Sequence, residues 1–227
     1  MLEKIRQNSE EMLRKYEARD IPLFLIDSYE LDKFDFEKLK VQLICDFPDL
    51  KREALILSLQ SSSREMIRLK VNQLRIRALV MAGVSATMAV APIPGVSIVV
   101  DTAIVCGEAV FYFKQLGLDD ESLRRHAKLY SADYNEMRST VNKALGIVNV
   151  AQMAKCVTTL LTTVGPAVAM AATEEAVSAI PIIGTILAVP MSFASTNLAL
   201  NLILDKFQEV ATEVTKCSVD GMTRPTE

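Results

Sequence analysis

The chain has no tryptophan, a single histidine and few aromatic residues, which make up 6% of its 227 positions. Half of the residues are nevertheless apolar, so a core has to be built from leucine, isoleucine, valine, alanine and methionine. Such a composition favours packed helices. One histidine cannot supply a metal site with several histidine ligands, and we expect no histidine-based catalytic triad. We expect this residue, His126, on the surface of a helix.

Positive charge is not in excess either. The net charge is -3, and no run of basic residues is interleaved with aromatic ones, so we expect no nucleic-acid partner. The four cysteines form no Cys-x-x-Cys pair, which predicts reduced and mostly buried thiols. The first twenty residues are charged where a secretory signal would be apolar. We therefore expect a cytoplasmic protein, with a possible membrane-facing side.

The motifs that bind a nucleoside triphosphate are missing from this sequence. No glycine is followed by lysine, so the phosphate-binding loop Gly-x-x-x-x-Gly-Lys-Ser/Thr does not occur, and neither does Asp-x-x-Gly. The tetrapeptide at residues 142–145 begins with Asn-Lys but lacks the aspartate that would read a guanine base. Without amides, a lysine and Mg²⁺ around the phosphates, GTP hydrolysis loses its main electrostatic stabilisation. We expect no catalysis by this chain alone.

The first sixty residues predict a helix, a strand and a second helix. Residues 2–19 carry a sparse apolar stripe typical of a surface helix, and the apolar run at residues 21–26 predicts a short strand buried on both faces. Asp35 is in position to cap a helix that Pro48 ends. A single strand leaves both of its backbone edges unpaired. We therefore expect the other strands of the sheet to lie upstream of Met1 in a longer protein.

A second helix-forming region follows Leu59. The serines at residues 61–63 predict a helix cap, and Ile67, Val71 and Leu74 fall on one face with Ala78. The polar side of this helix is basic, and its positive residues are Arg64, Arg68, Lys70, Arg75 and Arg77. A basic helix that leads into an apolar segment can contact anionic lipid headgroups or a partner protein. Such charges also serve simply to solvate an outer face.

Three runs of the sequence carry no charge, at residues 78–100, 156–173 and 176–204. Each is long enough to span the roughly 30 Å hydrocarbon core of a bilayer or comes close to it. Prolines interrupt all three, and each break frees backbone groups that lipid cannot satisfy. Two interpretations stay open: buried helices of a bundle, which the breaks favour, or insertion into a membrane as spans or hairpins.

Several segments together resemble a known family. Residues 22–28, 34–39 and 46–48 look like the end of the G domain of interferon-inducible, immunity-related GTPases (the IRG family), and residues 111–123 resemble a segment of its helical domain, including an aspartate cap before a new helix. The resemblance implies a mainly α fold in two parts. Residues 1–60 would be the C-terminal remnant of an α/β P-loop GTPase domain, and residues 61–227 the helical domain.

The resemblance also implies a function. The strand ending at Ile26 would be the last of the G domain, so Asp27 and Ser28 would lie beside the guanine base. Full-length family members use GTP and Mg²⁺, whereas this chain is expected to hold no cofactor. The parent protein would be a self-assembling GTPase of innate, cell-autonomous immunity, cytoplasmic and peripherally or partly attached to endomembranes or pathogen-containing vacuoles. Its partners would be the missing G-domain half or full-length relatives.

Two other functions remain open on the sequence. A nucleotide-free protein that pairs with full-length relatives and tunes their assembly would keep the helical surfaces without an active site. An integral membrane protein would be built from helical hairpins within the charge-free runs.

Overall fold

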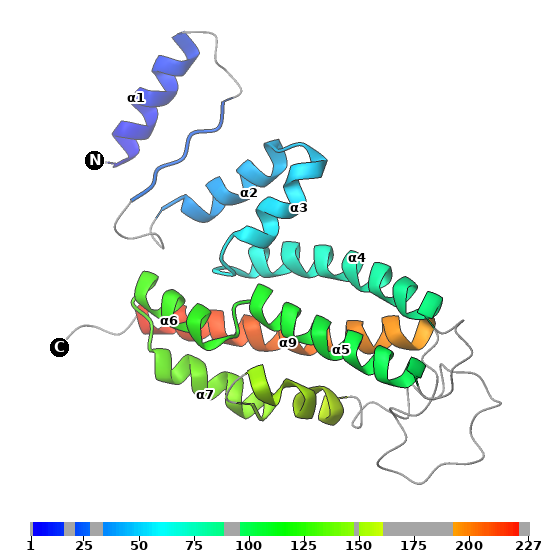
Figure 1. Ribbon diagram of the computed structural model, residues 1–227. Coiled ribbons are helices and arrows are strands. Elements are labelled where there is room, and N and C mark those ends of the chain that lie inside the picture. The colour runs from blue at the N-terminus through cyan, green and yellow to red at the C-terminus, as the bar shows by residue number, and fades with distance from the viewer. Residues whose placement is uncertain are drawn as a thin grey trace. The chain divides into compact units, whose positions relative to one another are not determined.

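The computed structural model describes residues 2–15, 21–27, 34–88, 96–147, 150–160 and 193–222. The chain divides into two compact units, residues 1–55 and 56–227, and each is described by itself. Helices make up most of both units, and the described ranges contain no β-strand (Figure 1). The prediction of a mainly α fold is confirmed. The predicted division into a G-domain remnant at residues 1–60 and a helical domain at residues 61–227 stays a prediction.

The first unit contains α1 (Leu2–Lys15), α2 (Phe36–Asp46) and the beginning of α3 (Asp49–Ser58), within which the boundary of the two units falls. As predicted, α1 is a surface helix, since Ile5 and Met12 are both about half exposed. Pro48 lies between α2 and α3, where it has no amide to continue the first helix. Its carbonyl instead accepts the amides of Lys51 and Arg52 in the first turn of α3.

The strand predicted at residues 21–26 is not formed. This segment is non-helical, and its only β-type pairing in the described residues is one antiparallel bridge between Ile26 and Phe34. None of its side chains is buried, and Ile21 is 59% exposed. A strand buried on both faces requires neighbouring strands and helices along its length, and the described residues supply one bridge partner.

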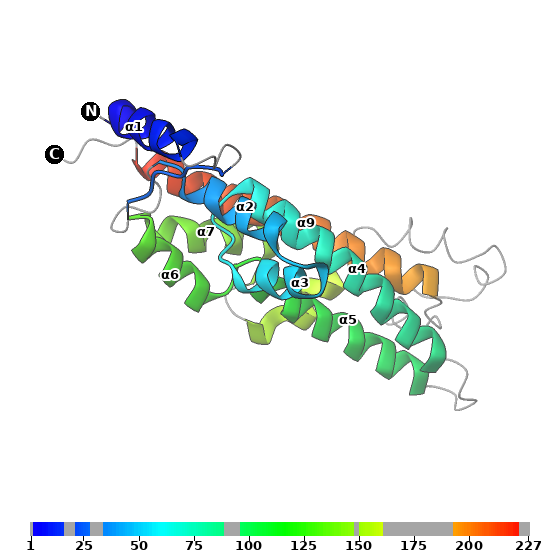
Figure 2. The ribbon, with the colours of Figure 1, turned by 90° about the horizontal axis from the view of Figure 1, so that it is seen from above.

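The second unit is a bundle of helices. It contains α4 (Arg64–Met88), α5 (Val96–Gln115), α6 (Asp120–Leu129), α7 (Tyr134–Leu145), the short 3-10 helix η1 (Val150–Gln152), a helical stretch at residues 153–160, and α9 (Phe193–Met222). The long α9 packs along α4, α5 and α7, as the two views in Figures 1 and 2 show. Residues far apart in the sequence thus share one core.

Side-chain caps mark where the bundle helices begin. Ser63 Oγ accepts the Met66 amide at 3.2 Å, and Asp119 Oδ2 accepts the Ser122 amide at 3.2 Å, so both predicted caps are confirmed. Asp133 caps α7 in the same way. At its other end α7 stops at Gly146, whose φ of 65° lies in the left-handed region that glycine adopts at low cost.

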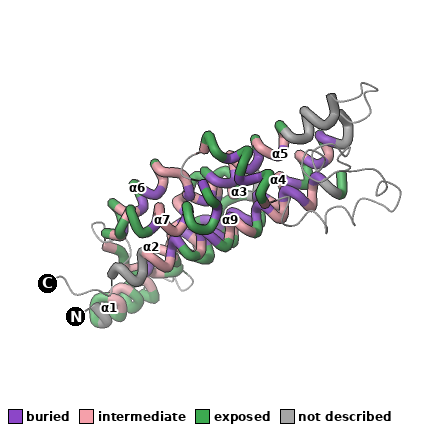
Figure 3. The backbone as a smooth tube through the Cα atoms, turned by 90° about the horizontal axis from the view of Figure 1, so that it is seen from below, coloured by how far each residue is buried: buried purple, intermediate pink, exposed green. Residues whose placement is uncertain are grey.

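The core of the bundle is formed by the faces of α4, α5, α7 and α9 that look inward. Figure 3 shows the buried positions in purple along these helices. All four residues predicted to share a face of α4 are buried, namely Ile67, Val71, Leu74 and Ala78. From α9, Phe207 is fully buried, and its ring meets that of Phe113 edge-on with 5.7 Å between the ring centroids. Aliphatic side chains supply most of the remaining core, as the composition predicted.

The search for membrane-crossing helices covers the described residues, and there no helix combines sufficient length with sufficient apolar character. The prolines that interrupt the three charge-free runs all lie at residues 89–95 and 161–192, outside the described residues.

The expectations for His126 and for the burial of the cysteines are wrong. His126 is 5% exposed and its ring packs against that of Tyr130. It follows Leu123 by three positions on the inner face of α6, which the neighbouring arginines at 124 and 125 conceal in the sequence. The cysteines are free but not mostly buried, since only Cys156 is buried and Cys45 is exposed. Burial raises the pKa of the Cys156 thiol to about 11.

Candidate functional site

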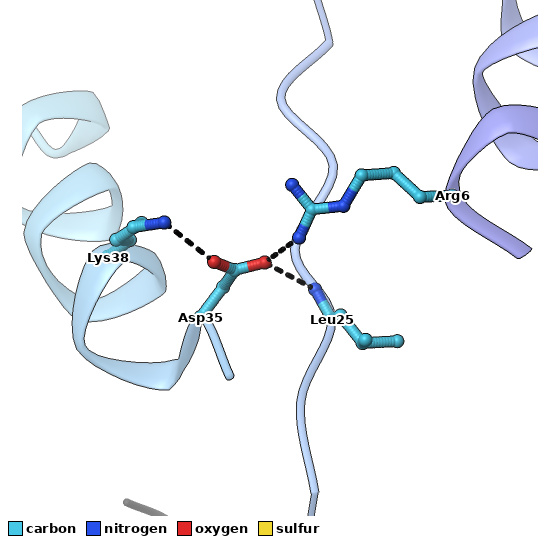
Figure 4. Close-up of polar contacts among 4 residues, drawn as sticks. All are labelled: Arg6, Leu25, Asp35 and Lys38. Carbon is cyan, nitrogen blue, oxygen red and sulfur yellow. Dashed lines mark hydrogen bonds and ion pairs between the residues drawn. The ribbon is translucent and has the colours of Figure 1, made fainter. Parts of the chain in front are cut away.

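A polar cluster around Asp35 holds the segment that leads to the predicted nucleotide-side loop (Figure 4). Asp35 Oδ1 accepts Lys38 Nζ at 2.8 Å, and Oδ2 accepts the Leu25 amide at 3.3 Å and pairs with the Arg6 guanidinium. The Asp35 side chain is 8% exposed. One carboxylate therefore joins α1, the segment at residues 21–27 and α2.

Asp35 precedes α2 as predicted, but its carboxylate does not cap the helix amides. It is turned toward the segment at residues 21–27 instead, where the Asp35 amide also donates to the Leu25 carbonyl at 2.8 Å. The preceding residue, Phe34, has a φ of 64°, which is uncommon for a residue other than glycine. This turn places the Asp35 side chain on the Leu25 side, so the prediction of a cap was wrong.

The surroundings of Asp35 lower its pKa to about 2. The Lys38 hydrogen bond is the largest cause, the Leu25 amide comes next, and the Arg6 charge adds to them against the opposing effect of burial. A carboxylate at this position is thus ionised throughout the physiological pH range and holds its three partners through charge-assisted hydrogen bonds.

The Asp35 cluster predicts a specific response to acid. The folded pKa of about 2 lies below the unfolded value of about 3.9, so the cluster stabilises the first unit above about pH 4. That stabilisation is lost as the pH falls through about 2. We expect the Asp35 carboxyl resonance, followed by NMR, to titrate near pH 2. A midpoint near 4 for Asp35 would show that the cluster does not form in solution.

The structure describes one of the two residues predicted to lie beside a guanine base. Asp27 is half-buried and directly follows Ile26, the residue of the antiparallel bridge. Ser28 lies outside the described residues. The Asp35 cluster fixes the backbone two residues before Asp27, at Leu25, and the role of both residues at a base stays a prediction.

The five basic residues predicted to contact a membrane or partner divide into two groups. Three contact other helices of the bundle. Lys70 is buried and donates to the Gln115 carbonyl at 2.8 Å, while Arg75 pairs with Asp205 at 2.5 Å on the exposed surface. Arg77 is the third and is described below. Arg64 and Arg68 are exposed on the outer side of α4. Their contact with a lipid surface or a partner stays a prediction.

Arg77 on α4 and Glu108 on α5 form a two-pronged ion pair. The guanidinium donates to both carboxylate oxygens, at 2.8 and 2.7 Å, and lies over the Phe111 ring at 4.3 Å. Glu108 is 4% exposed, whereas the Arg77 side chain is 41% exposed, so the pair links a buried carboxylate on α5 to a partly exposed guanidinium on α4. Sequence reasoning missed Glu108. The signal was present, because it is the one acidic residue between Asp101 and Lys114 in an otherwise apolar stretch.

A second polar cluster joins α6 to α7. The Tyr134 hydroxyl donates to Asp120 Oδ1, and Arg138 Nε lies 3.6 Å from the same oxygen. Arg124 Nε donates to Asp120 Oδ2 at 3.0 Å. The pKa of Asp120 is lowered, chiefly by the Tyr134 hydrogen bond and then by Arg124. These groups hold the two helices together, and as in the Asp35 cluster one carboxylate contacts two cationic side chains.

Metal-binding chemistry was sought wherever the structure is described. Those residues include no group of three histidine, cysteine, aspartate or glutamate side chains placed to hold a metal ion. The polar chemistry described above therefore consists of ion pairs and hydrogen bonds that position helices and the segment before Asp27.

Comparison with known proteins places this arrangement in a family. Interferon-inducible GTPase 5 of Rattus norvegicus is 27% identical over 214 residues, which cover 94% of this chain and 45% of that protein. Two Mus musculus proteins match shorter stretches. T-cell-specific guanine nucleotide triphosphate-binding protein 2 is 32% identical over 108 residues, covering 47% of this chain and 26% of that protein. Interferon-gamma-inducible GTPase 10 is 31% identical over 146 residues, covering 62% and 34%.

The chain thus spans about half the length of the rat relative it matches, or less in the mouse proteins. The model of the interferon-inducible GTPase (IIGP) family matches residues 1–211, which takes in the Asp35 cluster, the Arg77–Glu108 pair and most of α9. On this match across both compact units, the chain belongs to the interferon-inducible GTPase family.

Proposed function

We propose that this chain supplies the helical part of an interferon-inducible GTP-binding protein of innate, cell-autonomous immunity that acts at intracellular membranes. The observation that carries the proposal is the family match through residues 1–211, combined with a bundle that has a contiguous apolar core. Such a bundle is suited to mechanical work. It would pass the nucleotide state of a G domain to membrane contact and assembly through shifts of packed helices.

GTP and Mg²⁺ would be bound by a G domain that this chain does not contain. The sequence has no Gly-Lys step with which to form a phosphate-binding loop, so the groups that offset phosphate charge would come from a longer protein or a full-length relative. In this proposal the protein is cytoplasmic and peripherally attached to endomembranes.

Assays of the purified chain test whether GTP binding and hydrolysis require a G domain outside it. We expect no GTP hydrolysis above the buffer blank and no saturable binding of a fluorescent GTP analogue, because the phosphate-binding groups are absent from the sequence. A full-length family member, such as the rat interferon-inducible GTPase 5, assayed in parallel shows that the conditions support activity. Turnover by the isolated chain that persists through further purification would overturn the proposal.

A second candidate function is a nucleotide-free protein that pairs with full-length relatives and tunes their assembly. It is favoured by four apolar side chains on the outer face of α4, namely Ile76, Leu79, Val80 and Val84, which are 39–62% exposed. Residues at these spacings share one side of a helix. Co-purification with a full-length relative, with and without GTP, tests this candidate, and a Val80→Asp variant should reduce the recovery. Failure of the wild-type chain to co-purify in either condition would count against it.

A further inference from the structure

A small cavity in the second unit lies among the loop before α4, the C-terminal end of α5, α6 and the C-terminal half of α9. Its volume is about 180 Å³. Basic and hydroxyl side chains are prominent in its lining, and those used below are Ser61, Lys70, Lys114, Arg125, His126 and Thr215. Among the described residues that line it, no side chain is a carboxylate. In a chain of net charge -3, this is a local concentration of positive charge.

The charged groups of the cavity lie at two depths. Lys70 and His126 are 3% and 5% exposed, so they lie on the inner side, whereas Lys114 and Arg125 are exposed and lie at the rim. These four side chains comprise two ammonium groups, one guanidinium group and one imidazole. Charges of one sign around a concave site attract an ion of the opposite sign more strongly than the same charges spread over a flat surface.

The inner side of the cavity is held in place by the end of α5. Lys70 Nζ donates to the Gln115 carbonyl at 2.8 Å, and Ser61 Oγ donates to the same carbonyl at 3.2 Å. Carbonyls in the last turn of a helix have no partner within the helix, so these two contacts close α5. They also fix the Lys70 ammonium, which carries three donor hydrogens, at a defined place beside the cavity.

At the rim, Arg125 can release its present partner, Glu121, and bind another anion. Its contact with Glu121 is 2.9 Å long, but the two side chains are 62% and 81% exposed. Pairs of this exposure contribute little to stability, so an anion in the cavity can compete with Glu121 for the guanidinium. Lys114 lies at the last turn of α5 and reaches the rim from the other side.

We propose that this cavity binds a phosphate group, either free or as part of a small phosphorylated molecule or lipid headgroup. Ammonium and guanidinium groups together with hydroxyls are the donors that bind phosphate through charge-assisted hydrogen bonds. The cavity is smaller than the roughly 300–1,000 Å³ typical of drug-sized ligands, which suits one phosphate with a small attached group and not a nucleoside triphosphate. The site goes beyond the function proposed above and does not depend on it.

Calorimetric titration of the full chain with inorganic phosphate tests the site. We expect saturable binding that becomes roughly tenfold weaker or more in the Lys114→Gln/Arg125→Gln double variant, because two charge-assisted contacts are removed. Both residues are exposed, so the variant should fold, and circular dichroism checks this. The matched control is Lys128→Gln, an exposed lysine of α6 that does not line the cavity. Its affinity should equal that of the wild type.

Further binding experiments distinguish a lipid headgroup from free phosphate as the ligand. Tighter binding of an inositol monophosphate than of inorganic phosphate, together with flotation on vesicles that contain a phosphoinositide, would assign the site to a lipid headgroup. Equal affinities without flotation would assign it to free phosphate. Absence of binding by all three probes, or binding that the double variant leaves unchanged, overturns the proposal. Because GTP hydrolysis is assayed separately, the two proposals fail independently.

Discussion

Replacing Phe207 with alanine is expected to lower the free energy of unfolding of the bundle by about 3–5 kcal/mol. The side chain is fully buried on α9, and its ring packs edge-on against Phe113 of α5. Truncation removes apolar contacts and leaves a cavity between two long helices that cannot close without moving both of them. Urea unfolding followed by circular dichroism measures the loss as a shift of the midpoint at constant slope.

Phe193, the first residue of the same helix, provides the matched control. It is 44% exposed, so Phe193→Ala removes the same atoms with little loss of packing and should cost less than about 1 kcal/mol. Equal losses for the two variants would mean that α9 does not pack on α5 as described.

The second large effect is expected from Arg77→Met. This change leaves the buried Glu108 carboxylate without its two-pronged partner, and breaking one side of a buried pair typically costs about 3–5 kcal/mol. Arg77 itself is 41% exposed, and solvent there compensates part of the loss. We therefore expect about 2–4 kcal/mol, measured by the same unfolding experiment.

A double variant separates the ion pair from ordinary packing. Arg77→Met with Glu108→Leu removes both charges, and stability should return most of the way toward that of the wild type, because no unpaired buried charge remains. The control is Lys206→Gln, which breaks a pair with Glu209 whose two side chains are 31% and 63% exposed and should change stability by less than about 0.5 kcal/mol. If the double variant were as unstable as Arg77→Met, the loss would have to come from packing around the Phe111 ring.

The parts of the fold that sequence predicted well depend on local patterns. The inward face of α4 and the Ser63 cap follow from residues within one or two helical turns of each other, whereas the Asp119 cap was implied by the family resemblance. Where the prediction was wrong, a distant residue decided the outcome. Asp35 has the sequence of a helix cap, but Leu25 and Arg6, ten and 29 positions earlier, take up part of its carboxylate.

The same reasoning explains what was missed in the candidate site. A basic stripe on α4 can be recognised in the sequence, but its counter-charges cannot, since Asp205 lies 130 positions from Arg75 and Glu108 lies 31 positions from Arg77. Likewise, Lys70 of α4 and His126 of α6 line one cavity together with the C-terminal end of α5, although 56 positions separate them in the sequence. Sequence spacing gives the face of one helix, whereas the groups opposite that face depend on how the helices pack.

The position of α9 in the chain bears on how the bundle is made in the cell. The inward face of α4 is completed by α9, yet more than a hundred residues separate the two helices in the sequence. At synthesis rates of about 5–20 residues per second, the ribosome needs on the order of 5–30 s to produce them in succession. During that interval Leu74 and its neighbours have no α9 to cover them, so the nascent chain presents a surface that a chaperone would recognise before the last helix emerges.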